Sequence, residues 1–144
     1  MIVKIGDGAR LIVDVINNFL GVRFGQFRRA MYKNIAGRKC LWFPQVSLRP
    51  IGVQDVFKQS LSADNWLSAD GKELYEKARN VHIENTLSNN DSLVRITFAN
   101  IIPIKGYSFI GIFKYVGKRD GYRVYKRVSS KSDTTTWRRG TGGK

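Results

Sequence analysis

Residues that could carry out acid–base chemistry are few in this chain. His82 is the only histidine among 144 residues, and it lies two positions from Glu84 in a segment whose alternation predicts a strand. Residues two apart in a strand share a face, so this pair has the spacing of a general acid and base. A solvated surface pair explains the same spacing, and we favour that interpretation because such pairs are common.

No other group of residues has the pattern of a catalytic or metal-binding site. Cys40 is the single cysteine and has no partnered histidine, so we interpret it as a buried core residue. Glu73 and Lys77 fall in a segment expected to be helical, whereas a metal-dependent nuclease needs closely set acids and a lysine after a strand. The phosphate-loop, dinucleotide and zinc-ligand motifs are absent from the sequence. We predict no catalytic residue, cofactor or metal.

A second kind of chemistry, recognition of an unstacked nucleobase, fits several aromatic residues with polar neighbours. Such a pocket needs rings that stack on the base and a polar group that reads its edge. The alternative is that all of these residues belong to the core. The base-pocket candidates are Trp42, Phe43, Asp64, Asn65 and Trp66.

The element that organises the chain is a predicted hairpin. Its first arm, residues 107–116, has apolar residues on both faces and predicts a central strand. Asp120 and Gly121 favour a tight turn, because both tolerate positive φ. The second arm, residues 122–129, alternates basic and aromatic residues, which is typical of strands that bind nucleic acid. An ordinary solvated hairpin face is the alternative.

The formal net charge is +14, and the charge is unevenly distributed. Residues 1–49 hold nine Lys/Arg and two acids, residues 50–104 hold five and seven, and residues 105–144 hold eleven and two. Two basic ends suit an anionic polymer, and we favour DNA over RNA. The sequence shows no strongly amphipathic basic helix, so we predict no membrane partner. The phosphate-binding candidates are Lys118, Arg119, Arg123, Arg127, Arg138 and Arg139, with Tyr125 as a stacking candidate.

The remaining segments predict a mixture of helices and strands. Residues 11–19 predict a helix that is capped by Asp7 and stops at Gly21, with a strand as the alternative because of the β-branched residues. Residues 22–39 form either a second helix or a strand and loop. Residues 39–48 predict an edge strand broken by Pro44. Short helices are expected over residues 52–65 and, from the capping-box spacing of Asp70 and Glu73, over 70–79. Strands are expected at 81–86 and 93–99, which with the hairpin give four antiparallel strands.

These elements predict one α+β domain over residues 1–129, with N-terminal helices packed on a strongly curved antiparallel sheet or open barrel. Residues 130–144 lack apolar periodicity and predict a flexible basic tail, although Trp137 offers a docking point. A lone cysteine and the absence of a signal-peptide pattern favour a cytoplasmic location.

The hairpin and its surroundings resemble the end of the SRA domains, which are relatives of the PUA-like modules. The resemblance rests on Tyr-x-x-x-Gly-Ile-Phe-Lys-Tyr-Val at 107–116, Gly-Tyr-Arg-Val-Tyr-Lys-Arg at 121–127, and Trp137. SRA domains bind modified cytosine flipped from duplex DNA. The resemblance therefore implies a barrel-like sheet and a base pocket, without assigning the pocket residue by residue.

The sequence as a whole predicts a non-catalytic nucleic-acid-binding module. The narrower hypothesis is that the module reads a modified base, as restriction enzymes and epigenetic readers of this type do. A small nuclease using His82 and Glu84 is one alternative. A basic protein-interaction or ribosome-associated domain is another, and it would co-purify with a partner rather than bind naked DNA.

Overall fold

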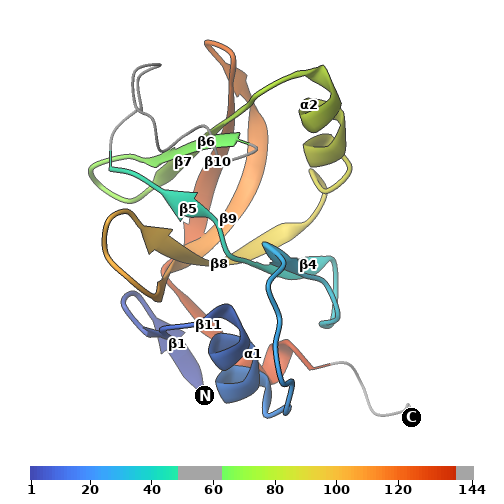
Figure 1. The fold of residues 1–144 in the computed structure, drawn as a ribbon, viewed down its shortest axis with the longest axis vertical. Coiled ribbons are helices and arrows are strands. Elements are labelled where there is room, and N and C mark those ends of the chain that lie inside the picture. The colour runs from blue at the N-terminus through green and yellow to red at the C-terminus, as the bar shows by residue number, and fades with distance from the viewer. Residues whose placement is uncertain (49–62, 139–144) are drawn as a thin grey trace.

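A computed structural model describes residues 1–48 and 63–138, and it is mostly sheet with two α-helices (Figure 1). The strands of the N-terminal half and their bounds are β1 Ile2–Lys4, β2 Gly8–Ala9, β3 Met31–Tyr32, β4 Lys39–Trp42 and β5 Gln45–Val46. Those of the second half are β6 Ala63–Leu67, β7 Glu73–Ala78, β8 Val94–Ile101, β9 Tyr107–Arg119, β10 Tyr122–Ser129 and β11 Lys131–Asp133. The helices are α1 Ile12–Leu20, α2 Val81–Ser88 and the short 3₁₀ turn η2 Thr134–Thr136.

The main sheet has the strand order β3-β4-β8-β9-β10-β7-β6, with β2 added on β9 and β5 on β8. A separate pair joins β1 to β11. Over the described residues the sheet is not closed into a barrel, because its strand order ends at β3 and β6. Both β4 and β5 run parallel to β8, so the sheet is mixed rather than purely antiparallel, and β4 lies between β3 and β8 rather than at an edge.

The predicted hairpin is confirmed as β9 and β10, which pair from Arg119 and Tyr122 at the turn. Asp120 and Gly121 have φ values of 54° and 81°, the conformation that a two-residue turn of this kind requires. The strand predicted at 93–99 is confirmed as β8, which pairs with β9. The hairpin therefore lies in the middle of the main sheet, where β8 pairs with β9 and β7 pairs with β10.

The predicted N-terminal helix is confirmed as α1, and Gly21 ends it in the left-handed conformation with its N–H donating to Asn17 O. Asp7 does not cap this helix. Its Oδ2 instead accepts from the Lys4 N–H at 2.8 Å, in the turn after β1. The buried side of α1 packs into a core that includes Phe98, Phe109 and Trp137.

Two predicted elements are wrong: a predicted helix is a strand, and a predicted strand is a helix. The segment predicted as a helix over 70–79 contains a turn and then β7, because Asp70 closes the turn by accepting from Ser68 Oγ at 2.7 Å and from the Lys72 N–H at 2.9 Å. Residues 81–86 belong to α2 rather than a strand, and Asn80 caps this helix by accepting from the Ile83 N–H at 2.9 Å. Only three of the four predicted antiparallel strands of this region exist as predicted. The helix predicted over 52–65 lies largely outside the described residues, and its last three residues are in β6.

The segment expected to be a tail begins instead with ordered structure. β11 pairs with β1, and Trp137 is fully buried, with its Nε1–H donating to Ser132 Oγ at 2.8 Å. The backbone carbonyl of Trp137 accepts from the Ala36 N–H at 2.8 Å. Within the described part of the chain, neither helix has the length and apolar character needed to cross a membrane.

Candidate functional site

The register of β6 and β7 sorts their side chains onto two faces of the sheet. Asn65 lies directly opposite Glu76, and Trp66 lies directly opposite Tyr75. Because side chains alternate along a strand, the first pair shares one face and the second pair shares the other. Asn65 and Glu76 line a cavity of about 290 Å³, together with Trp42, Phe43 and the segment that enters β5. We call this space the Trp42 cavity.

The Trp42 cavity contains polar atoms that the fold leaves available. Asn65 Nδ2 donates to the Gln45 carbonyl at 3.2 Å, whereas the buried Asn65 Oδ1 has no hydrogen-bond partner among the described residues. Leaving a buried acceptor without a hydrogen bond costs about 1–3 kcal/mol of folding free energy. A ligand that donates a hydrogen bond to Asn65 Oδ1 in the cavity would remove this cost.

Glu76 supplies the second polar group of the cavity. The residue is only 3% exposed, and its carboxyl group accepts from Tyr125 Oη at 2.6 Å. Burial raises the pKa of Glu76 above its ordinary value, while the Tyr125 hydrogen bond and the charges of Arg95 and Arg123 oppose that rise. The site therefore offers a carboxyl group that takes up a proton more readily than a solvated one.

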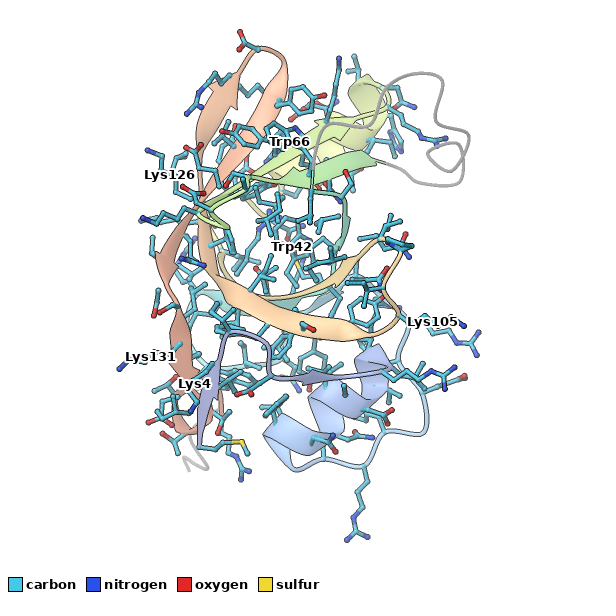
Figure 2. All side chains as sticks on the ribbon, turned by 90° about the vertical axis from the view of Figure 1, so that its left-hand side faces the viewer. Lys4, Trp42, Trp66, Lys105, Lys126 and Lys131 are labelled. Atoms are coloured by element: carbon cyan, nitrogen blue, oxygen red, sulfur yellow. The ribbon has the colours of Figure 1, made fainter. Side chains whose placement is uncertain are left out.

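Trp42 forms the aromatic wall of the cavity and is held rigidly. It packs on Tyr125 with ring centroids 5.0 Å apart, and the Arg95 guanidinium lies 4.5 Å from both ring centroids. Such cation–π contacts are strongest when the cation is desolvated, and Arg95 is fully buried. Trp42 lies in the interior of the domain in Figure 2 and also lines a second, neighbouring cavity of about 570 Å³ with Arg29 and Lys33.

The other base-pocket candidates are only partly brought together. Phe43 lines the Trp42 cavity, and it also packs in the core against Phe98 and Tyr107. Trp66 faces away and stacks on Tyr75 at 4.2 Å, well apart from Trp42 in Figure 2. Asp64 lies in β6 opposite Lys77.

Several phosphate-binding candidates have other partners. Arg123 is 1% exposed and forms ion pairs with Glu76 at 3.4 Å and with Glu84 and Asp91, so it is not available to phosphates. Tyr125, the stacking candidate, is fully buried behind Trp42 and cannot receive a base from solvent.

The remaining basic candidates are placed differently. Lys118 pairs with Glu84 at 3.5 Å and Arg119 with Glu73 at 3.5 Å, and each side chain is 54% exposed. Arg127 is half-buried, Arg138 is exposed, and Arg139 lies outside the described residues.

The proposed acid–base pair of His82 and Glu84 does not form. The two residues lie on α2, where a separation of two places them on different sides of the helix. His82 is exposed, and Glu84 binds Arg123. Burial raises the pKa of the Cys40 thiol to about 11, which fits an inert core residue.

Sequence reasoning missed Glu76, Gln45 and Arg95. The capping-box spacing of Asp70 and Glu73 predicts a helix here, in which Glu76 would not face Asn65. The run Glu73–Ala78 has no period-two pattern of apolar residues, so no local signal marked Glu76 as a strand residue.

Comparisons with known proteins agree with this architecture. The profile of the SRA family, the SET and RING associated domain, matches residues 6–134. Among solved structures, the fold is similar to the 5-hydroxymethylcytosine-specific restriction enzyme AbaSI, with a TM-score of 0.60 and 21% sequence identity. The likeness covers 90% of this chain and 39% of that enzyme, so the chain spans about two fifths of its length. No match was found among curated proteins.

The family match covers nearly the whole chain, including the hairpin, Trp42, Asn65 and Glu76. The match also covers α1 and the residues that line both cavities. This chain belongs to the SRA (SET and RING associated) domain family.

Proposed function

We propose that this chain binds duplex DNA and reads a modified cytosine by holding the flipped-out base in the Trp42 cavity. The observation that carries the proposal is the convergence of Asn65 Oδ1, which has no partner among the described residues, and the Glu76 carboxyl group beside the Trp42 ring. Membership of the SRA family, and the likeness to an enzyme specific for 5-hydroxymethylcytosine, support this proposal.

The polar pair favours cytosine over thymine on hydrogen-bond grounds. Cytosine presents an amino donor at N4, whereas thymine presents a carbonyl acceptor at the equivalent position. Asn65 Oδ1 is an acceptor only, so it satisfies the amino group and would face the thymine oxygen without a hydrogen atom between them. In its protonated form Glu76 adds a donor for a ring acceptor; burial raises its pKa towards that form, while the Tyr125 hydrogen bond and the charges of Arg95 and Arg123 oppose the rise.

The aromatic wall provides the second part of recognition. Flipping a base costs a few kcal/mol of unstacking, which stacking on a ring and new edge hydrogen bonds offset. Trp42 is fixed by Tyr125 and Arg95, so its orientation is set before a base arrives. Arg28 also lines the cavity and carries a charge suited to the DNA backbone.

The decisive test compares matched duplexes that contain cytosine, 5-methylcytosine or 5-hydroxymethylcytosine at one position, at fixed salt, by fluorescence anisotropy. Phosphate contacts are common to all three, so a preference for a modified duplex has to come from the pocket. We expect such a preference, and a linear fall of log affinity with log salt for every duplex. Equal affinity for all three would remove the base-reading proposal and leave an electrostatic binder.

Incubation of the same duplexes with and without Mg²⁺, followed by denaturing electrophoresis, separates this proposal from the nuclease alternative. The proposal assigns recognition to this chain, and it predicts intact DNA under both conditions.

A further inference from the structure

Four lysines form two like-charged pairs, one in the main sheet and one in the separate β1–β11 pair. Lys114 of β9 lies directly opposite Lys126 of β10, and Lys4 of β1 lies directly opposite Lys131 of β11. All four side chains are exposed. Like charges directly opposite each other destabilise a sheet, so two such pairs are an unfavourable arrangement for the isolated domain. We call these four residues the lysine strip.

The strip is short enough to act as one surface. Lys126 and Lys131 are five residues apart along consecutive strands, which limits their backbone separation to roughly 17 Å. Figure 2 shows Lys126, Lys131 and Lys4 along one edge of the molecule. Duplex DNA carries one phosphate charge per roughly 1.7 Å of helix axis, so several phosphates fit within this length.

Acidic residues near the strip are already engaged. Glu73 lies opposite Lys126 but pairs with Arg119 at 3.5 Å and accepts from Tyr75 Oη. Asp133 pairs with the N-terminal amine at 3.6 Å, and Asp7 accepts from the Lys4 backbone N–H. Within the described residues, none of the four lysine side chains forms an ion pair.

The strip faces away from the Trp42 cavity. Tyr125 points inward and packs on Trp42, so the adjacent Lys126 points to the opposite face of β10. Lys105 lies on the far side of the molecule from the strip in Figure 2, two residues from Tyr107, which lines the cavity. A duplex whose base enters the cavity is therefore not the duplex that the strip would contact.

We propose that the lysine strip binds the phosphate backbone of a second DNA segment, so that one molecule bridges two duplexes. The choice of DNA as the partner rests on the proposed function, and the charge arrangement is independent of the cavity. Contacts of this kind are independent of sequence and modification, because phosphates carry no base information. Bridging would keep the domain on DNA while the cavity engages one base.

The test is a two-duplex capture assay with the whole chain at a concentration where light scattering shows a monomer. Beads carry a duplex with 5-hydroxymethylcytosine, and a labelled unmodified duplex is added with the protein. The strip variant is Lys114→Gln with Lys126→Gln. The control variant is Arg23→Gln with Arg38→Gln, which removes the same charge from exposed residues of the loops before β3 and β4.

We expect wild type and the control variant to capture the labelled duplex and the strip variant to lose most of that capture. The strip variant should keep its preference for the modified duplex in direct binding. The slope of log affinity against log salt for the second duplex should fall in magnitude by roughly 1.8, which corresponds to two lost phosphate contacts. Its thermal unfolding midpoint should match or exceed that of wild type, which excludes misfolding as the cause.

Absence of capture by wild type, or equal capture by strip and control variants, would overturn the inference. Strip-dependent binding to phosphatidylserine vesicles without capture of the second duplex would also overturn it, in favour of a membrane surface. Capture that depends on the strip, together with equal binding of modified and unmodified duplexes, would support the strip and refute the proposed function.

Discussion

Asn65 and Glu76 lie directly opposite each other across the β6–β7 ladder and present their polar ends to the same cavity. This relationship requires both residues to be in strands and both strands to be in this register. A shift of one residue would place Asn65 opposite Tyr75 or Lys77 and turn its side chain away from the face that holds Glu76. The site is therefore a property of strand register as much as of residue type.

Replacing Asn65 by Leu tests the amide oxygen. The change removes an acceptor that has no partner among the described residues, so we expect the preference for cytosine over thymine in the flipped position to fall by about 1–3 kcal/mol. The free energy of unfolding should change little, because the unpaired buried oxygen is lost together with the Gln45 hydrogen bond. Competition binding with duplexes that differ at one base measures the first quantity and urea unfolding the second. An unchanged preference would show that Asn65 does not read the base.

The pH dependence of stability tests the burial of Glu76. Its folded-state pKa is raised, so the folded chain holds a proton that the unfolded chain releases as pH rises above the ordinary value of 4.5. Stability should therefore fall as pH increases from about 4.5 towards the folded-state pKa, and Glu76→Gln should lack this contribution. Urea unfolding at a series of pH values gives the difference between wild type and Glu76→Gln. A difference in unfolding free energy between the two proteins that does not change with pH would contradict the raised pKa of Glu76.

Replacing Arg123 by Leu tests whether this residue is structural. It joins Glu76 of β7 to Glu84 and Asp91, and no residue of the described helix α2 is buried. Removing one partner of a buried ion pair costs about 3–5 kcal/mol, so we expect a large loss of unfolding free energy. Lys118→Ala, an exposed neighbour in the same hairpin, should cost less than about 1 kcal/mol. Equal unfolding free energies of the two variants would show that the buried ion pairs of Arg123 do not stabilise the fold.

Gly111 and Gly117 provide a matched pair in β9. Their φ values are 128° and 131°, so alanine is strained at both positions. A Cβ on Gly111 would overlap the Arg127 side chain and lie 2.9 Å from the Ser129 carbonyl, whereas none of the surrounding atoms comes within 4 Å at Gly117. We expect Gly117→Ala to cost about 1–3 kcal/mol and Gly111→Ala to cost more. Thermal unfolding of both variants, and of the double variant Gly111→Ala with Arg127→Ala, separates the cost of backbone strain at positive φ from the cost of the overlap with the Arg127 side chain.

The sequence was informative where local chemistry decides the structure. The turn residues Asp120 and Gly121 fixed the hairpin, and Gly21 marked the end of α1, since both signals depend only on backbone conformations that few residues adopt. The same logic failed between residues 70 and 88. There Asp70 stabilises a turn as readily as it caps a helix, and a short alternating run after Asn80 is too brief to oppose a good N-cap.

The candidate site was only partly predictable for a related reason. Alternation along β10 separates two faces but does not say which one is buried, so Arg123 and Tyr125 were placed at the surface although both lie in the interior. Trp42 and Asn65 were found from residue type, while Glu76 and Arg95 depend on pairings between distant strands. Those pairings are set by tertiary packing and leave no local signal.

The most direct test of the account is the binding of cytosine, 5-methylcytosine and 5-hydroxymethylcytosine duplexes by Glu76→Gln, Asn65→Leu and Trp66→Ala at fixed salt. Trp66 stacks on the face opposite the cavity, so Trp66→Ala serves as the control. The account predicts that wild type and Trp66→Ala prefer a modified duplex, and that Glu76→Gln, whose amide keeps a donor, keeps a preference as well. Asn65→Leu, which has no acceptor at this position, should bind all three with similar affinity. A preference that survives in Asn65→Leu, or that is lost in Trp66→Ala alone, would contradict the account.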